Sequence, residues 1–183
     1  MNDKTKQYQT LSAQVAALVS GETDEVGVLA NVAAALKETF PERFFWVGFY
    51  LIKRKSSIPS GAIATPPPSG EGWEGAAKRE LECLRLGPFQ GPVACYTIPY
   101  GKGVCGSAWK ERCTLVVPDV EQFPGHIACS SLSRSEIVVP VFDGAGQVRG
   151  VLDIDSRDLN AFDQTDQEWL ERIVKIVADE IYN

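Results

Sequence analysis

Apolar residues recur at helical spacing near both ends of the chain. Three stripes predict amphipathic helices: Leu11, Val15, Leu18 and Val19; Leu29, Val32, Leu36 and Phe40; and Leu170, Ile173, Val174, Val177 and Ile181. Pro41 ends the second helix, because proline cannot continue the backbone hydrogen bonds. Asp163 is a good N-cap for the third.

Between these helices, runs rich in β-branched and aromatic residues predict strands. They cover residues 44–52, 81–86, 93–98, 115–117, 137–142 and 148–154. The last two flank Asp143-Gly144-Ala145-Gly146, a turn signal that predicts a hairpin. A glycine-rich turn at 101–103 opens a short helix through Trp109, and an irregular loop follows from 118 to 133. Helices at both ends of mostly antiparallel strands predict an α+β fold with one sheet.

Residues 53–80 differ from the rest of the chain in composition. Sixteen of these 28 positions are Pro, Gly, Ser or Ala, and Pro66-Pro67-Pro68 is incompatible with a helix or a central strand. We interpret the segment as a surface insertion between two strands of a single domain spanning residues 1–183. The functional alternative is a lid that carries Trp73 over a pocket.

The charge balance disfavours nucleic acid and anionic membranes as partners. Lysine and arginine number 18 against 24 acidic residues, for a net charge of −6. No apolar stretch approaches the roughly 20 residues that cross a bilayer, and the N-terminal MNDKTKQYQT does not read as a secretory signal. We therefore expect a cytoplasmic protein, whose five cysteines are more often free, catalytic or redox-active than structural.

Three cysteines stand in settings that favour chemistry. Cys129 lies in a polar, serine-rich loop, where backbone amides can stabilise an exposed thiolate. Cys105 follows the glycine-rich turn. Cys95 lies in a predicted apolar strand, which fits a buried structural thiol equally well. Cys83 and Cys113 are interpreted as structural thiols.

The sequence predicts no metal site. It contains no CxxC pair, and its single histidine, His126, stands three residues before Cys129. A Cys/His hydrolase with His126 as the base for Cys129 is disfavoured, because such dyads come from distant segments and no further triad member is evident. The glycine-rich turn also lacks the GxxxxGK[ST] pattern of a phosphate-binding loop.

Carboxylates on the predicted hairpin are more informative. Asp153 and Asp155 alternate with Leu152 and Ile154, so both carboxylates share one strand face, about 7 Å apart. Glu136 begins the partner strand, and the three can converge on one pocket. Like charges raise one another's pKa, so such a group could protonate a leaving oxygen or hold an ammonium. The alternative is a solvated sheet face without a function.

Six ordered segments together resemble the free methionine-(R)-sulfoxide reductases, a branch of the GAF domains. They are WVGFYL (46–51), LGPFQGPVAC (86–95), IPYGKGVCG (98–106), VPDVEQFPGHIAC (117–129), SEIVVPV (135–141) and GVLDIDS (150–156). They span almost the whole chain except the N-terminal helix and the insertion. The sequence departs from the family pattern at that insertion and at Ser130, where many relatives carry an acidic residue.

The resemblance implies an enzyme that reduces free L-methionine-(R)-sulfoxide to L-methionine without a metal or organic cofactor. Cys129 would be the catalytic thiol, Cys95 the resolving thiol and Cys105 a third that assists exchange. The reaction would pass through a sulfenic acid at Cys129 and an intramolecular disulfide, which an external dithiol such as thioredoxin reduces.

The resemblance also implies a substrate site. Its acidic members would bind the amino acid and polarise the sulfoxide, and two aromatic residues would approach the substrate methyl group. The acidic members are Glu136, Asp153, Asp155 and Asp119, and the aromatic ones are Trp46 and Tyr50. The carboxylates would hold the substrate ammonium, which peptide-bound methionine lacks. Relatives also lead us to expect a homodimer.

Two other functions remain open from the residues. GAF domains commonly bind small ligands without catalysis, and a fold does not fix a function. Alternatively, Cys95 and Cys129 form a redox switch that reports peroxide. The switch leaves the three carboxylates without a role.

Overall fold

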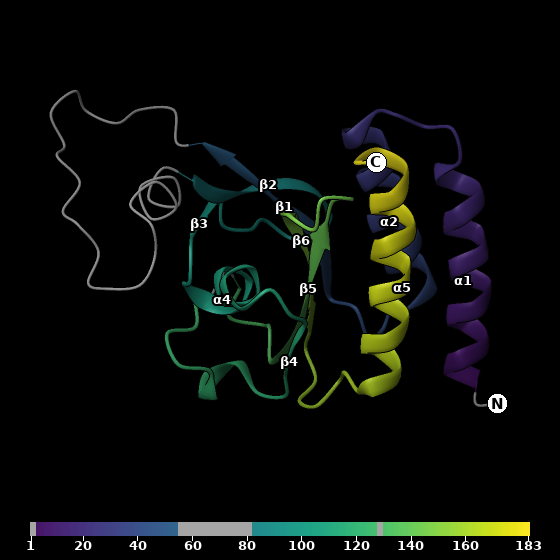
Figure 1. Cartoon of the computed structure of the whole chain (residues 1–183). Helices are drawn as coiled ribbons and strands as arrows, with labels where there is room; N and C mark the ends of the chain where they lie inside the picture. The colour runs from purple at the N-terminus through teal and green to yellow at the C-terminus, as the bar shows by residue number, and fades with distance from the viewer. Residues whose placement is uncertain (1–2, 55–81, 128–129) are drawn as a thin grey trace, which may run out of the picture.

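The computed structural model describes residues 3–54, 82–127 and 130–183. Helices α1, α2 and α5 lie on one side of a curved sheet and α4 lies on the other (Figure 1). The elements are α1 (Asp3–Val19), α2 (Glu25–Thr39), β1 (Trp46–Arg54), β2 (Glu82–Gln90), β3 (Thr97–Pro99), α4 (Gly103–Glu111), β4 (Leu115–Val117), the 3-10 helix η1 (Val120–Gln122), β5 (Ser135–Phe142), β6 (Val148–Ser156) and α5 (Gln164–Ile181). The predicted insertion lies outside the described residues from position 55 on, and Trp73 with it.

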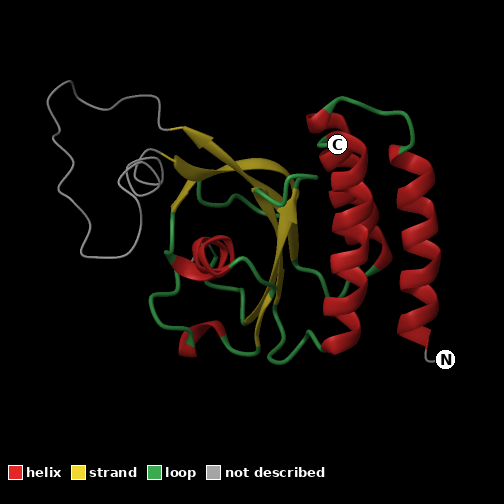
Figure 2. Ribbon diagram, viewed as in Figure 1, coloured by secondary structure: helices red, strands yellow, loops and turns green. Residues whose placement is uncertain are grey.

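The six strands form one sheet, yellow in Figure 2. Their order in it is β3-β2-β1-β6-β5-β4. Every neighbouring pair is antiparallel. The β5–β6 hairpin, with its turn at 143–147, pairs Glu136 with Asp155. The predicted α+β fold with one antiparallel sheet is therefore confirmed.

The main core lies between the sheet and the helices α2 and α5. The predicted apolar stripes of all three long helices supply most of its helical residues, and Leu152 and Ile154 of β6 lie fully buried beneath them. Helix α2 begins where the Asp24 side chain accepts a hydrogen bond from the Gly27 amide, and it ends at Thr39, just before Phe40 and Pro41. Helix α5 begins with the predicted N-cap Asp163.

Helix α1 packs on α2 and α5 and is held by a buried carboxylate at the start of α5. Asp166 is completely buried and accepts hydrogen bonds from Tyr8 Oη at 2.8 Å, Lys4 Nζ at 2.7 Å and Arg43 Nη2 at 2.9 Å. Its other role is the capping box with Asp163. Two cations and a phenol thus compensate a charge that burial alone would make costly.

The predicted strand at 93–98 is wrong for most of its length. Only Thr97–Pro99 form β3, and residues 91–96 are a loop between β2 and β3. Gly91 adopts φ 141°, and Pro92 has no N–H to donate to a neighbouring strand. Val93 is 87% exposed, so the apolar run is not buried. This loop carries Cys95.

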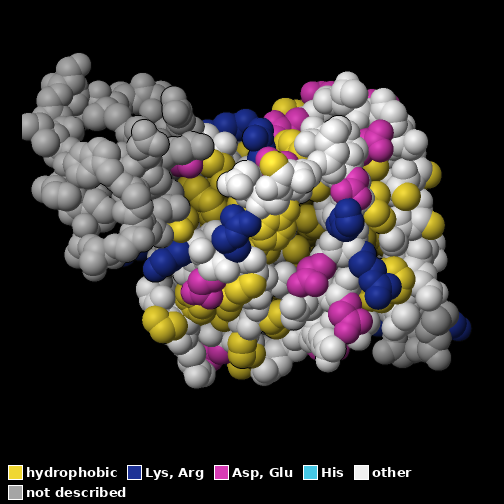
Figure 3. Space-filling model, viewed as in Figure 1, with side chains coloured by type: hydrophobic (Ala, Val, Ile, Leu, Met, Phe, Trp, Pro, Cys, Tyr) yellow, Lys and Arg dark blue, Asp and Glu magenta, His cyan; other side chains and the backbone are white. Residues whose placement is uncertain are grey.

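The surface of the described residues mixes charges of both signs. On the face shown in Figure 3, lysine and arginine side chains alternate with acidic ones, and no extended basic area is visible among the described residues. In the described part of the chain, no helix has both the length and the apolar character that a membrane crossing requires.

Candidate functional site

The face of the sheet that turns away from α2 and α5 carries the predicted acidic residues. Asp155 of β6 lies opposite Trp46 of β1 on one side and Glu136 of β5 on the other, and Asp153 lies opposite Gly48. Directly opposed residues of antiparallel strands point to the same face. The register therefore brings the carboxylates of Glu136, Asp153 and Asp155 together, as strand alternation predicts.

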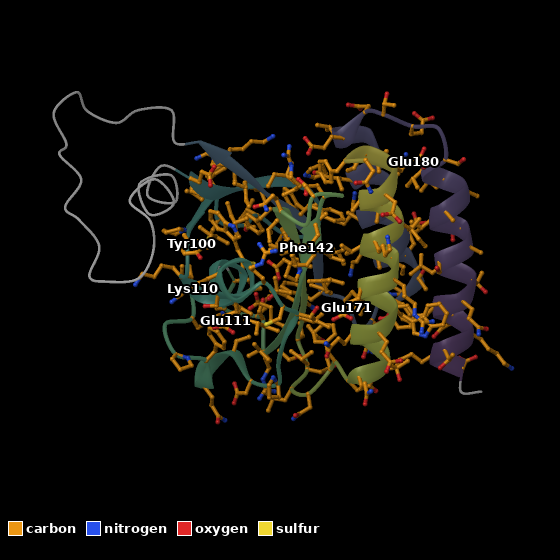
Figure 4. The ribbon with its side chains drawn as sticks, viewed as in Figure 1. Tyr100, Lys110, Glu111, Phe142, Glu171 and Glu180 are labelled. Atoms are coloured by element: carbon orange, nitrogen blue, oxygen red, sulfur yellow. The ribbon has the colours of Figure 1, made fainter. Side chains whose placement is uncertain are left out.

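Helix α4 covers this face and adds a thiol to the carboxylates. Cys105 is 3% exposed, and its Sγ lies 3.8 Å from Oε1 of Glu136. The helix approaches the sheet closely at Gly106, where a Cβ atom would lie 2.4 Å from the carbonyl oxygen of Pro99. Tyr100 lies beside α4 (Figure 4), and its ring meets Trp109 edge-on with centroids 4.7 Å apart. Gly106, within α4, thus allows the helix to lie close to the sheet over the carboxylates.

Burial favours the protonated forms of the carboxyl groups in this cluster. Glu136 is 6% and Asp153 is 7% exposed. Burial raises the pKa of Glu136 well above its ordinary value, and the charge of Asp153 raises it further. Burial also raises the pKa of Asp153, with the charge of Asp155 as the second cause. The alternative of a solvated face is wrong, because α4 excludes water from it.

Burial raises the pKa of both Glu136 and Asp153. The hydrogen bond between the two side chains raises the pKa of Glu136 and lowers that of Asp153, which favours Glu136 as the group that holds a proton. Asp155 is half-buried, and burial raises its pKa to about 6 against a hydrogen bond from Ser133. At neutral pH burial therefore favours a protonated carboxyl group at Glu136, beside Asp155, whose pKa of about 6 leaves it largely ionised. Cys105 stays a thiol, because burial and then the charge of Asp153 raise its pKa.

These groups surround a small cavity of about 20 Å³. Its polar lining consists of Cys105, His126, Ser133, Glu136, Asp153 and Asp155, and its apolar lining includes Ile98, Val104 and Ile127. This volume holds about one water molecule. A bound amino acid requires the cavity to widen, and the loop between η1 and β5, with His126, Ile127 and Ser133, supplies the part of the lining that belongs to neither the sheet nor α4.

Sequence reasoning did not place two residues of this lining. His126 Nε2 lies 4.0 Å from Oε2 of Glu136, and burial lowers the pKa of the imidazole. From the sequence, His126 is a candidate only as a base for its neighbour Cys129. The Ser133 side chain donates a hydrogen bond to Asp155. Both belong to the polar loop between η1 and β5, whose serine-rich character was the one available signal.

The predicted aromatic residues support the loop that carries Cys95. Trp46 is buried and donates its Nε1 hydrogen to the carbonyl oxygen of Pro92 at 3.0 Å. Tyr50 is buried and donates its hydroxyl hydrogen to the carbonyl oxygen of Cys95 at 3.0 Å. The two rings stack, with centroids 5.9 Å apart. Neither residue lines the cavity, so contact with a substrate methyl group stays a prediction.

Asp119 is not brought to the carboxylate cluster. It is the N-cap of η1, where its side chain accepts from the Glu121 amide at 3.1 Å and from Nε2 of Gln122 at 2.8 Å. It lines a separate surface depression with Phe123 and Asn160. The structure thus gives Asp119 a local capping role.

The cysteines of the described residues differ in state. Cys95 is disulfide-bonded and half-buried, whereas Cys83, Cys105 and Cys113 are free thiols. The alternative of Cys95 as a structural thiol in a strand is wrong, since it lies in the exposed loop. Cys83 is buried as predicted, but Cys113 is exposed and contributes to no core. Cys129, the predicted catalytic thiol, lies outside the described residues.

The chain is similar to known proteins along nearly its whole length. The GAF domain family model matches residues 22–181. GAF domain-containing protein A of Dictyostelium discoideum is 47% identical over 174 residues, which are 95% of this chain and 92% of that protein. The free methionine-R-sulfoxide reductase of Escherichia coli (strain K12) is 37% identical over 94% of this chain and 87% of its own length.

The chain is also similar to a solved structure. The free methionine-R-sulfoxide reductase of Neisseria meningitidis, determined in complex with its substrate, superposes with a TM-score of 0.80 and 44% sequence identity. The match covers 98% of this chain and 91% of that one.

Proposed function

The chain belongs to the GAF domain family and, within it, to the free methionine-R-sulfoxide reductases, and we propose that it reduces free methionine-(R)-sulfoxide to methionine with its own thiols. The observation that carries the proposal is the buried cluster of Glu136, Asp153 and Asp155, which holds a proton beside an ionised carboxylate at neutral pH. Reduction of free methionine sulfoxide needs both groups. The protonated carboxyl group supplies a proton to the sulfoxide oxygen, and the ionised carboxylate binds the substrate ammonium.

Glu136 is the proton donor of the proposed reaction. The Cys129 thiolate takes the sulfoxide oxygen, and the proton of Glu136 accompanies it, so that Cys129 becomes a sulfenic acid and methionine is released. The substrate sulfur gains two electrons and the Cys129 sulfur loses two. Solvent then reprotonates Glu136. The ionised Asp155 binds the substrate ammonium, which gives the preference for the free amino acid.

Cys95 closes the proposed cycle. Its thiol attacks the sulfenic acid of Cys129, a disulfide forms, and the oxygen leaves as water. The disulfide-bonded state of Cys95 supports this role. Its neighbours Val93 and Tyr96 are 87% and 76% exposed, so the bond is accessible to a protein dithiol such as thioredoxin. Exchange with that dithiol restores both thiols. No metal or organic cofactor takes part in these steps.

The test follows methionine formation from each epimer of free methionine sulfoxide with dithiothreitol as the reductant. We expect turnover of the (R) epimer alone and its loss in Cys129→Ser. Glu136→Gln, which keeps the shape but holds no acidic proton, should lower turnover by roughly 10²–10⁴-fold. Cys113→Ser, at an exposed thiol outside the cavity, is the matched control and should match the parent protein.

The same assay separates the rival functions. A small-ligand sensor would form no methionine from either epimer. A redox switch would form its disulfide with peroxide but show no turnover of the sulfoxide. Either result, in a folded and fully reduced sample, would refute the reductase proposal.

A further inference from the structure

The carboxylate cluster has the composition of a zinc site. Cys105, Glu136 and Asp153 each offer one ligand atom, all three residues are buried, and these atoms lie within 4.8 Å of one another. His126 Nε2 adds an imidazole nitrogen 4.0 Å from Oε2 of Glu136. Thiolate, imidazole and carboxylate are the three ligand types that bind Zn²⁺ in proteins. No sequence motif indicates this site, because the four residues come from three separate parts of the chain.

An unsatisfied atom points into this cluster. Asp153 is 93% buried, and its Oδ1 has no hydrogen-bond partner among the described residues. Buried carboxylate oxygens are almost always paired, so an orphaned one calls for a partner that the protein itself does not provide. Asp153 lines the cavity of about 20 Å³, which has the size of a single ion or water molecule.

We propose that Cys105, Glu136, Asp153 and His126 bind one Zn²⁺ ion. Ligand bonds of about 2.0–2.3 Å in a tetrahedron set the ligand atoms about 3.3–3.8 Å apart. The distance of 3.8 Å between Cys105 Sγ and Glu136 Oε1 already falls there, and the other separations among Cys105, Glu136 and Asp153 must close by about 1 Å or less. His126, whose Nε2 lies 4.0 Å from Oε2 of Glu136, must move toward these three ligand atoms to complete the tetrahedron. Magnesium and calcium are disfavoured, since both need six or more ligand positions filled mainly by oxygen.

The zinc site shares Glu136 and Asp153 with the proposed substrate site. A bound ion and the sulfoxide substrate therefore exclude each other, so that zinc inhibits the enzyme. This consequence rests on the proposed function, whereas the binding of the ion does not.

The test is a titration with Co²⁺, which replaces Zn²⁺ and reports a thiolate ligand by a charge-transfer absorption in the near ultraviolet. The protein is used with its disulfide intact, so that Cys95 is not available as a ligand. We expect one equivalent of Co²⁺ to give the absorption and one equivalent of Zn²⁺ to abolish it. Cys113→Ser should leave the absorption unchanged, because this thiol is exposed and lies outside the cavity.

Two substitutions locate the site. Cys105→Ser should remove the absorption, and Asp153→Asn should keep it but weaken binding by at least the roughly 10–100-fold that the loss of a supporting group costs. Circular dichroism establishes that both variants fold. Absence of the absorption in the parent protein, its retention in Cys105→Ser, or unweakened binding by Asp153→Asn would overturn the site. Methionine formation without cobalt binding refutes the zinc site alone, and cobalt binding without methionine formation refutes the proposed function alone.

Discussion

Replacing Asp155 by asparagine should stabilise the protein at neutral pH and not at acidic pH. Burial raises the pKa of Asp155 from 3.8 to about 6 in the folded state. The folded protein therefore binds more protons than the unfolded chain between these values, and the free energy of unfolding falls as the pH rises through them. The two pKa values differ by about 2, which corresponds to about 3 kcal/mol.

The variant removes this cost because an amide carries no charge to desolvate. Asparagine keeps the size of the side chain and an oxygen that can accept the hydrogen bond from Ser133. As the pH falls below the unfolded value of 3.8, Asp155 becomes protonated in both states, and the advantage of Asp155→Asn should shrink toward zero. Above pH 7 it should reach about 1–3 kcal/mol, the upper value applying if no water reaches the half-buried carboxylate.

Urea unfolding followed by circular dichroism at pH 3.5 and pH 8 measures both quantities. Asp158→Asn is the matched control, since Asp158 is exposed near the end of the same strand. The decisive quantity is the change in the stabilisation between the two pH values, about 1–3 kcal/mol for Asp155→Asn and near zero for the control. An Asp155→Asn variant whose stability relative to the parent does not depend on pH would refute the argument.

Three further substitutions test other parts of the structure. Asp166→Ala leaves the cations and the phenol around it without their partner, and it should lower the free energy of unfolding by about 3–5 kcal/mol in a denaturant titration. Gly106→Ala places a Cβ atom 2.4 Å from the carbonyl oxygen of Pro99 and pushes α4 away from the carboxylates. We expect the free energy of unfolding to fall by about 1–3 kcal/mol in a denaturant titration. Reductase activity, measured as methionine formation, should fall with it. Tyr50→Phe removes the hydrogen bond to the Cys95 carbonyl oxygen and should lower the free energy of unfolding by about 0.5–1.5 kcal/mol. It should also slow disulfide formation, which is measured by counting free thiols after one turnover. Unchanged kinetics would show that the hydroxyl does not position the loop.

The sequence predicts the elements whose pattern is long or capped. The three long helices, the stop at Pro41 and the N-cap Asp163 agree with the structure. Of the first stripe, Leu11, Val15 and Val19 are buried, but Leu18 is exposed, so its assignment to the apolar face is wrong. The hairpin around residues 143–147 agrees as well, because its turn residues and its alternation point to the same register. These features depend on contacts that are local or that repeat with a fixed period.

The sequence pattern predicts the wrong element where glycine and proline next to a short apolar run set the backbone conformation. Residues 93–98 have strand composition, yet Gly91 and Pro92 turn the chain out of the sheet and leave Val93 in solvent. Composition also misses Asp166, because the cations and the phenol that compensate its charge lie more than 120 residues away. A buried charge is compensated by the tertiary structure, and no spacing along the chain records which residues will compensate it.

The acidic residues show where a sequence pattern stops and tertiary structure begins. Alternation places Asp153 and Asp155 on one face, but it cannot tell whether that face is wet. Helix α4 decides the matter, since its close approach at Gly106 buries Glu136 and Asp153 and brings Cys105 to 3.8 Å from a carboxylate oxygen. The same burial that makes these side chains costly for folding raises their pKa and keeps a proton available at neutral pH. Substitutions that remove the cost of burying these carboxylates should therefore stabilise the protein and impair the proposed chemistry. Measuring both the free energy of unfolding and the reductase activity of Asp155→Asn tests this expectation.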